Sequence, residues 1–297
     1  MQSVRFLLLS TSLLPMALAV GMKAAEVSSQ PYSEIRFEHQ KQADPVRQIF
    51  VARVDLSDPD VDVRVSPGGP DPDGPGEYQT TLQVPTVIAE RERFELAVNG
   101  DFFRAQQTVN AEGKKSGYVD GKWAAVKGPA VTDGNLWGPA TEARPVIFFD
   151  AAKKARIAET KDVPTDALQA MAGSHVIVKD GVNCAPNTDS FAKTQHPRTA
   201  AGIADNGKTL VLVVVDGRRP TSAVGMSLTD LADLMKKLGC RDALNLDGGG
   251  SSEMVLRDPQ NGQLQVVNSP SDGRERAVAN VLGVSIRGVK RMPATPK

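Results

Sequence analysis

Alternating hydrophobic and polar positions mark the first structural elements of the chain. Between residues 48 and 65, apolar side chains alternate with polar ones in two runs that begin at Ile49 and Val61, a period typical of β-strands. The next segment, 66–77, is rich in Pro, Gly and Asp and predicts a surface loop. Similar patterns predict a short helix at 86–91 and short strands at 94–98, 117–126, 145–149 and 175–178.

The C-terminal third has the pattern of a strand, a helix and a second strand. The continuous apolar run at 209–215 is typical of a strand buried on both faces. Ser227 suits the N-cap of a helix, and Gly239 stands where a left-handed C-cap belongs. A strand at 242–246 follows, and two strands joined through one helix are normally parallel neighbours in a right-handed crossover. We therefore predict an α+β fold, with a mixed β-sheet core, a βαβ crossover in the C-terminal third and a few packed helices.

The N-terminus predicts export. Arg5, the apolar stretch 6–20 and small residues spaced for cleavage, at Ala17-Leu18-Ala19 or around Ala24-Ala25, are typical of a signal peptide. No later segment is long and apolar enough to cross a bilayer. We expect a signal peptide at 1–25, an N-terminal extension at 26–47, a single catalytic domain at 48–290 and a C-terminal tail at 291–297. The expected location is periplasmic or secreted, without a transmembrane segment in the mature chain.

Charge and cysteine content narrow the partners. Lys+Arg and Asp+Glu both number 35, so the formal net charge is zero and gives no support for nucleic-acid binding. Cys184 and Cys240 could pair in an oxidising compartment, but the sequence does not show that they approach each other. It does not indicate an oligomeric state either.

The motif with the strongest functional signal runs from Asn245 to Ser252, where an aspartate is followed by three glycines and two serines. Consecutive glycines lose much entropy on folding, so they indicate positive φ angles or a ligand close to bare backbone. An ordinary hairpin turn is the simpler interpretation, but such turns need only one or two glycines and no flanking aspartate.

Three aspartates occupy similar positions, because Asp101, Asp216 and Asp247 each follow a predicted strand in a turn that contains glycine. The predicted crossover brings the last two loops to one edge of the sheet, where ligands bind in such folds. Carboxylates in a cleft can activate water, stabilise an oxocarbenium ion or hold a divalent metal. Calcium or magnesium is therefore an open expectation, although no spacing requires a cofactor.

Arginines supply candidate anion-binding groups. A guanidinium matches two oxygens of a phosphate, and Arg198 and Arg218 lie beside predicted strands. Arg276 and Asn280 are weaker candidates on spacing, and Arg219 is expected to be a solvated surface charge. The three histidines, His39, His175 and His196, are too scattered to form a metal set and are expected to be structural or exposed.

Several ordered motifs resemble the phosphodiester glycosidase family. They are Ala97-Val98-Asn99-Gly100-Asp101-Phe102-Phe103, Pro197-Arg198-Thr199-Ala200-Ala201-Gly202, Asp216-Gly217-Arg218 with Ser222 and Gly225-Met226-Ser227-Leu228, the segment 245–252, and Arg276-Ala277-Val278-Ala279-Asn280. The resemblance covers roughly residues 48–287. It implies hydrolysis of a sugar-1-phosphodiester, which releases a free sugar and a phosphomonoester, but it does not identify the sugar.

The residues suit this chemistry. We expect the catalytic carboxylate from Asp247 or Asp101, with Asp216 also a catalytic candidate, and phosphate contacts from Arg198 and Arg218. The full set of expected substrate-binding residues is Asn99, Arg198, Thr199, Arg218, Asn245, Gly248, Gly249, Gly250, Ser251, Ser252, Arg276 and Asn280. The substrate would be a small or polymeric glycosyl phosphodiester.

Two alternatives remain open. The chain could be a hydrolase or transferase that acts on phosphodiester-linked sugars during exopolysaccharide maturation, or a non-catalytic glycan-binding protein on the same scaffold. Release of reducing sugar from a substrate panel separates the enzymes from the binder. In a binder, Asp247→Asn would leave glycan affinity intact.

Overall fold

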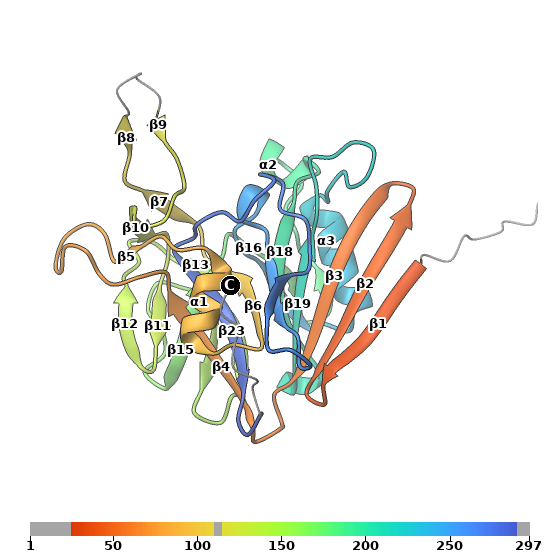
Figure 1. The fold of residues 1–297 in the computed structure, drawn as a ribbon, viewed down its shortest axis with the longest axis horizontal. Coiled ribbons are helices and arrows are strands. Elements are labelled where there is room, and N and C mark those ends of the chain that lie inside the picture. Colours follow the sequence, from red (N-terminus) through yellow and green to blue (C-terminus); the bar gives the residue numbers. More distant parts are fainter. Residues whose placement is uncertain (1–24, 110–114, 290–297) are drawn as a thin grey trace, which may run out of the picture.

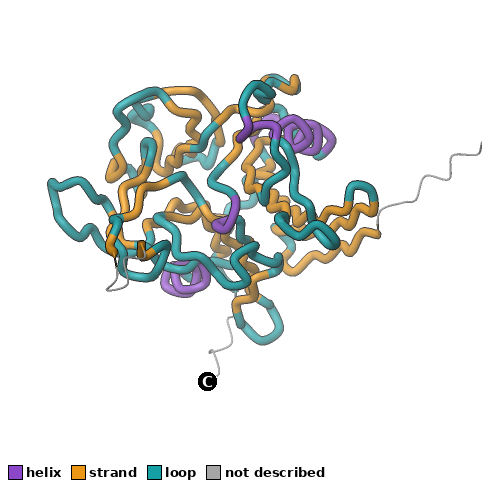
Figure 2. Tube along the Cα trace, turned by 90° about the horizontal axis from the view of Figure 1, so that it is seen from above, coloured by secondary structure: helices purple, strands orange, loops and turns teal. Residues whose placement is uncertain are grey.

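The computed structural model describes residues 25–109 and 115–289 and consists mostly of antiparallel β-sheet. The expected signal peptide, apart from residue 25, and the expected C-terminal tail lie outside these residues. Figure 2 shows a body of strands and loops with a few short helices. The helices are α1 (Pro85–Glu92), α2 (Ser190–Lys193) and α3 (Leu228–Lys237), with 3-10 turns η1 (Asp205–Gly207) and η2 (Gly249–Ser251).

The largest sheet has eight strands and lies on the right in Figure 1. Its order is β1 (Ala25–Tyr32), β2 (Ile35–Ala43), β3 (Val46–Asp55), β19 (Thr209–Val215), β18 (Arg198–Ala204), β20 (Asp242–Asn245), β16 (His175–Lys179) and β17 (Val182–Asn183). The segment 26–47, expected as an extension, supplies β1, β2 and the start of β3 in this sheet.

The predicted crossover between neighbouring strands is wrong. Strands β19 and β20 are joined through α3 and run in the same direction, but β18 lies between them and pairs antiparallel with both. All strand pairs of the described residues are antiparallel, so the sheet is not mixed. The reason is that β18 precedes β19 in the chain and forms a hairpin with it through η1, which leaves its other edge for β20.

Two five-stranded sheets lie at the centre and left of Figure 1. The first has the order β22 (Leu264–Val266), β21 (Met254–Arg257), β6 (Leu96–Asn99), β23 (Asn280–Ile286) and β4 (Val61–Pro67). The second has the order β12 (Asn135–Gly138), β11 (Ala130–Thr132), β15 (Ala167–Ala172), β13 (Arg144–Asp150) and β14 (Ala155–Thr160). Two small sheets consist of β5 (Thr80–Thr81), β10 (Trp123–Val126) and β7 (Phe103–Ala105), and of β8 (Thr108–Val109) and β9 (Lys115–Ser116).

Strand β19 separates the two main hydrophobic cores, as its continuous apolar run predicts. Leu210, Leu212 and Val214 face the core shared with the five-stranded sheets, whereas the alternate residues face α3. Helix α3 itself begins as expected, because Ser227 Oγ accepts the amide of Asp230 at 3.1 Å. The eight-stranded sheet is therefore the middle layer of the molecule.

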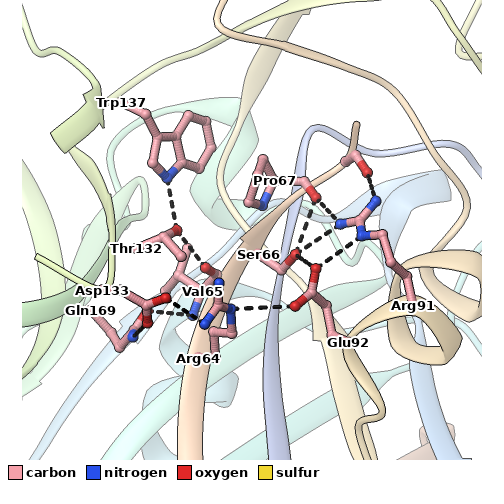
Figure 3. Close-up of polar contacts among 11 residues, drawn as sticks. Arg64, Val65, Ser66, Pro67, Arg91, Glu92, Thr132, Asp133, Trp137 and Gln169 are labelled. Atoms are coloured by element: carbon pink, nitrogen blue, oxygen red, sulfur yellow. Dashed lines mark hydrogen bonds and ion pairs between the residues drawn. The ribbon is translucent and has the colours of Figure 1, made fainter. Parts of the chain in front are cut away.

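Side chains of β11 and β15, in the second five-stranded sheet, form hydrogen bonds with the backbone of β4, the edge strand of the first (Figure 3). Both backbone groups of Val65 on edge strand β4 are bonded: Gln169 Oε1 accepts its amide at 3.0 Å, and Thr132 Oγ1 donates to its carbonyl at 2.6 Å. On the same strand, Arg64 pairs with Asp133 at 2.5 Å and with Glu92 at 3.3 Å. These contacts fix the relative position of the two sheets and seal an edge that would otherwise expose unpaired backbone groups.

We expect Gly283→Ala on β23 to lower the free energy of unfolding by about 1–3 kcal/mol. A Cβ at this position would lie 2.1 Å from the ring carbons of Phe94, which is itself buried. Denaturant unfolding measures the effect, and Gly117→Ala, which meets nothing within 4 Å, is the matched control. Equal stability of Gly283→Ala and the wild type would contradict this packing.

Candidate active site

The loops after β19 and β20 meet at Pro197, just before β18. A Cβ on Gly217 would lie 2.6 Å from the Pro197 nitrogen, and one on Gly248 would lie 2.8 Å from the Pro197 carbonyl oxygen. That oxygen also accepts the amide of Gly249 at 2.9 Å. The two loops therefore share one edge of the sheet because both pack against the residue that leads into the strand between them.

A buried asparagine joins the two large sheets at this edge. Asn99, at the end of β6, donates from Nδ2 to the carbonyl of Asp247 at 2.7 Å. Its Oδ1 accepts Thr199 Oγ1 at 2.7 Å and the amide of Glu253 at 3.1 Å. The polar groups of Asn99 and Thr199, both expected to bind substrate, thus have partners inside the protein and position the loop that carries Asp247.

Asp101 is buried and only partly hydrogen-bonded. Its amide donates to Asn280 Oδ1 at 2.7 Å, and its Oδ2 accepts the amide of Gly128 at 3.0 Å. Its Oδ1 has no partner among the described residues. Burial is the main cause that raises the pKa of Asp101 to about 7; the nearby Asp247 carboxylate also raises it, and the amides of Gly128 and Phe102 lower it.

Asp247 is half-buried and lies within the electrostatic influence of Arg276 and Arg218. Its Oδ1 accepts the amide of Gly248 at 2.8 Å. Burial raises the pKa of Asp247 to about 6, while the Ser251 side chain, the Gly248 amide, Arg276 and Arg218 lower it. The two interacting carboxyl groups can therefore hold one proton and one negative charge near neutral pH, as catalytic acid and base pairs do.

The glycine loop is covered by two arginines. A Cβ on Gly249, whose φ is 63°, would lie 2.8 Å from Arg218 Nη2, and one on Gly250 would overlap the Arg276 guanidinium at 2.0 Å. Arg276 also pairs with Asp272 at 2.7 Å. Arg218 is exposed and makes no hydrogen bond or ion pair with any part of the chain that the structure describes. The bare backbone is thus needed for arginine approach, and one guanidinium is free to bind an anion.

Arg198, which was expected to contact phosphate, uses two of its nitrogens inside the protein. Its side chain is buried, its Nε donates to the Met226 carbonyl at 3.0 Å, and its Nη2 donates to the carbonyls of Phe191 at 2.6 Å and Thr194 at 2.9 Å. The guanidinium also lies 4.6 Å from the centre of the Phe191 ring. Burial lowers the pKa of Arg198 to about 10. Its donors therefore hold the α2 segment against β18.

Asp216 likewise has partners within the protein. Its Oδ1 accepts Asn268 Nδ2 at 2.9 Å, and both carboxyl oxygens lie 3.1 Å from the amide of Ser269. Burial raises its pKa, against these hydrogen bonds, which lower it. The carboxylate therefore anchors the 268–269 segment, and the geometry favours Asp101 and Asp247 as the reactive pair.

Several other expected site residues contribute buried polar atoms without a hydrogen-bond partner in the described structure. These atoms are Asn245 Oδ1, Asn280 Nδ2, Ser251 Oγ and Ser252 Oγ. Buried polar atoms in native proteins nearly always have partners, so an unsatisfied cluster indicates a place for water or ligand. The hydroxyl of Ser251 lies close enough to Asp247 to lower its pKa.

Two residues near the site, Arg144 and His175, were not predicted as site residues. Arg144, at the start of β13, lowers the pKa of Asp101, and its Nε is buried without a partner among the described residues. His175 is the cross-strand partner of Asn245 and is half-buried. The antiparallel register that places them here has no signal in the sequence, although His175 stands at the start of a predicted strand.

Other sequence expectations concern metals, membranes and cysteines. Within residues 25–109 and 115–289, no three His, Cys, Asp or Glu side chains gather as a metal site would require. None of the helices in the same ranges is long and apolar enough to span a bilayer. Both cysteines are free thiols, with Cys184 exposed and Cys240 buried.

Paired carboxyl groups beside arginines are typical of hydrolytic sites, and comparisons with known proteins identify the family. The chain belongs to the phosphodiester glycosidase family, whose model matches residues 92–285.

Individual relatives differ in length and origin. Over 228 residues the chain is 31% identical to the SPbeta prophage-derived uncharacterized protein YomE of Bacillus subtilis, a match that covers 72% of this chain and 31% of that protein. The chain thus spans less than a third of the length of this relative.

Solved structures share the fold. The catalytic domain of zebrafish N-acetylglucosamine-1-phosphodiester alpha-N-acetylglucosaminidase, auto-inhibited by its pro-peptide, is similar with a TM-score of 0.61 at 20% identity, covering 90% of this chain and 89% of that one. A hypothetical protein from Synechocystis has a TM-score of 0.60 at 14% identity and covers 89% and 64%. At these identities the likeness concerns the fold alone.

We expect a narrow bell-shaped pH profile of kcat/KM. Because the pKa of Asp247 is raised to about 6 and that of Asp101 to about 7, the form with one carboxylate and one carboxylic acid dominates between them. Activity should rise through the lower value and fall through the upper one. Asp101→Asn should remove the alkaline limb, and Asp216→Asn, a second buried carboxyl, should leave both limbs in place. An unshifted profile for Asp101→Asn would contradict the assignment.

We expect Glu253→Gln to stabilise the protein increasingly as pH rises. Burial raises the pKa of Glu253 to about 10 from 4.5, and Glu275 raises it further. The folded state therefore binds this proton more tightly than the unfolded state, and stability falls as pH rises between the two values. At pH 7 the variant should gain roughly 3 kcal/mol. Denaturant unfolding at pH 5, 7 and 9 measures the difference in free energy of unfolding between the variant and the wild type. For the exposed Glu159→Gln this difference should not change with pH. A difference that is the same at all three pH values for Glu253→Gln would refute the raised pKa.

Proposed function

We propose that this protein hydrolyses the bond between the anomeric carbon of a sugar and a phosphodiester, and that it releases a free sugar and a phosphomonoester. The observation that carries the proposal is the interacting pair Asp101 and Asp247 beside a glycine loop covered by Arg218 and Arg276. Membership of the phosphodiester glycosidase family supports it.

The reaction follows from the charges of the site. Water attacks the anomeric carbon and gives a proton to the Asp247 carboxylate, while the bond from that carbon to the bridging oxygen breaks and the phosphomonoester leaves with both bonding electrons. Asp247 also stabilises the positive charge that develops on the sugar. Asp101 keeps its proton and holds the carboxyl pair at a single negative charge.

Arginines replace a strong general acid at the leaving group. A phosphomonoester already carries stable negative charge, so its departure needs electrostatic stabilisation more than protonation. Arg218 has free donors among the described residues, and Arg276 is held by Asp272 against the Gly250 backbone. We assign the phosphate to these two guanidinium groups and not to Arg198, whose donors bind main-chain carbonyls.

We also propose that the protein acts after export. Support comes from the basic residue Arg5 and the apolar stretch 6–20, which lie outside the described residues. N-terminal sequencing of the protein recovered from the periplasm or medium tests this, and a chain that retains residues 1–20 in the cytoplasm would refute it.

We expect the wild type to release reducing sugar and phosphomonoester in equal amounts from at least one member of a panel of glycosyl methyl phosphodiesters. In water enriched with heavy oxygen, the label should enter the sugar, because the anomeric carbon is attacked. Arg218→Gln should lower kcat/KM by about 10- to 100-fold, since a charge-assisted hydrogen bond is lost.

The control for this variant is Arg241→Gln. Arg241 precedes β20 at the opposite end of the same sheet and pairs with Asp180 on the surface, so its loss should leave kcat/KM unchanged. Label in the phosphate would show attack at phosphorus and overturn the mechanism. A wild type that binds glycans without turnover, with affinity retained in Asp247→Asn, would identify a binding protein instead.

A further inference from the structure

Two sides of the site differ in hydrogen-bonding character. On the glycine-loop side, Arg218 and Arg276 offer only donors. On the Asp101 side, the buried atoms without partners in the described structure include one acceptor, Asn245 Oδ1, and two donors, Arg144 Nε and Asn280 Nδ2. Asp101 Oδ1 joins them and donates while the carboxyl group keeps its proton. This difference indicates which side of the site binds the sugar and which side binds the phosphate of a glycosyl phosphodiester. The assignment rests on the proposed function.

The orientation of the Asn245 amide is fixed by its neighbours. Its Nδ2 donates to the Leu246 carbonyl at 2.7 Å and to Ser174 Oγ at 2.9 Å. Because a carbonyl can only accept, the nitrogen must face Leu246, and the unsatisfied atom is an acceptor. Asn245 therefore needs a donor from outside the described protein structure.

His175 continues this network. Its Nδ1 lies 3.0 Å from Ser174 Oγ, and its ring stacks against Phe191 with 5.8 Å between centroids. These contacts fix the imidazole, whose Nε2 has no hydrogen-bond partner among the described residues. Burial lowers the pKa of His175 and favours the neutral ring, which can donate or accept at Nε2 according to its tautomer.

Arg144 lies close enough to Asp101 and to His175 for its charge to lower the pKa of both. Its Cβ and Cγ lie 3.4 Å from the Cβ position of Gly128, whose amide binds Asp101. The adjacent Pro145 carbonyl accepts the amide of Gly173, which places the turn before His175 alongside. The Nη2 of Arg144 pairs with the exposed Glu142 at 2.7 Å, and its Nε is buried without a partner among the described residues.

Ligand chemistry follows from this mixture of donors and acceptors. Phosphate oxygens of an ionised diester only accept hydrogen bonds and cannot satisfy Asn245 Oδ1, whereas a sugar hydroxyl both donates and accepts. We propose that Arg144, His175 and Asn245 form the sugar-binding side of the site and hold hydroxyl groups of the glycosyl unit. The phosphate then lies on the Arg218 and Arg276 side, with the anomeric carbon between them beside Asp101 and Asp247.

A comparison of variants with deoxygenated substrates tests the proposal. On the best substrate of the panel, Arg144→Gln and His175→Phe should each lower kcat/KM by about 10- to 100-fold. On the analogue that lacks the hydroxyl held by the replaced side chain, the loss should shrink to under about 3-fold. Arg218→Gln should lower kcat/KM by the same factor on every analogue. Equal losses on all analogues for both Arg144→Gln and His175→Phe would overturn the proposal.

Arg144→Lys separates direct contact from an effect through charge. Lysine keeps the positive charge near Asp101 but lacks the Nε donor, so activity should stay low while the alkaline limb of the pH profile stays in place. Full activity in Arg144→Lys would show that the residue acts only by charge and would refute the sugar contact. Thermal unfolding of each variant confirms that it is folded.

Binding measurements distinguish a failure of this proposal from a failure of the proposed function. If the wild type turns over no substrate, the proposed function fails, and calorimetry with N-acetylglucosamine 1-phosphate and inorganic phosphate tests the assignment alone. Arg144→Gln should weaken the sugar phosphate about 10-fold or more and leave inorganic phosphate within about 2-fold. An equal loss for both ligands would place phosphate at Arg144, and no binding of either ligand by the wild type would overturn both proposals.

Discussion

The site depends on the buried side-chain amide of Asn99. A primary amide in the protein interior must be hydrogen-bonded, and here its partners lie on β18, on the loop that carries Asp247 and at Glu253, just before β21. Both atoms of the amide are used, so the ends of two sheets are held in one arrangement. The short spacing between Asn99 and Asp101 then brings the second carboxyl group next to the first. Catalytic geometry is thus set by an internal polar contact between layers.

The sequence predicts the structure well where the conformation of a segment depends on its own residues. The apolar run of β19, the cap of α3 at Ser227 and the glycines after Asp247 each describe a local conformation, and each is found. Pairing between distant strands has no such local signal. A helix such as α3 can connect β19 to β20 whether the two strands are direct neighbours or have another strand between them. Nothing in the pattern therefore shows that β18 separates β19 from β20. The contribution of His175 depends on that long-range register and could not be read from the sequence.

Arg198 and Arg218 show why residue type alone does not assign a role. Both lie in polar motifs beside strands, and a guanidinium binds carbonyl oxygens as readily as phosphate. The difference is burial: Arg198 lies under α2, where main-chain carbonyls need donors, whereas Arg218 stands at the surface of the glycine loop. Asp216 and Asp247 differ in the same way, because Asp216 is buried among its partners Asn268 and Ser269, whereas Asp247 is half-buried.

The unsatisfied polar atoms around Asp101 have a practical consequence for ligand discovery. A protein that lacks hydrogen-bond partners at its site is less stable than the same protein with a ligand that supplies them. Any compound that binds only the folded state raises the melting temperature, and the stabilisation grows with the logarithm of the ligand concentration over Kd, with about 2.7 kcal/mol gained at a hundredfold excess. A library of sugar phosphates can therefore be ranked by thermal shift before any reaction product is known. Asn245 Oδ1 and Asn280 Nδ2 are the atoms to which such compounds would supply hydrogen-bond partners.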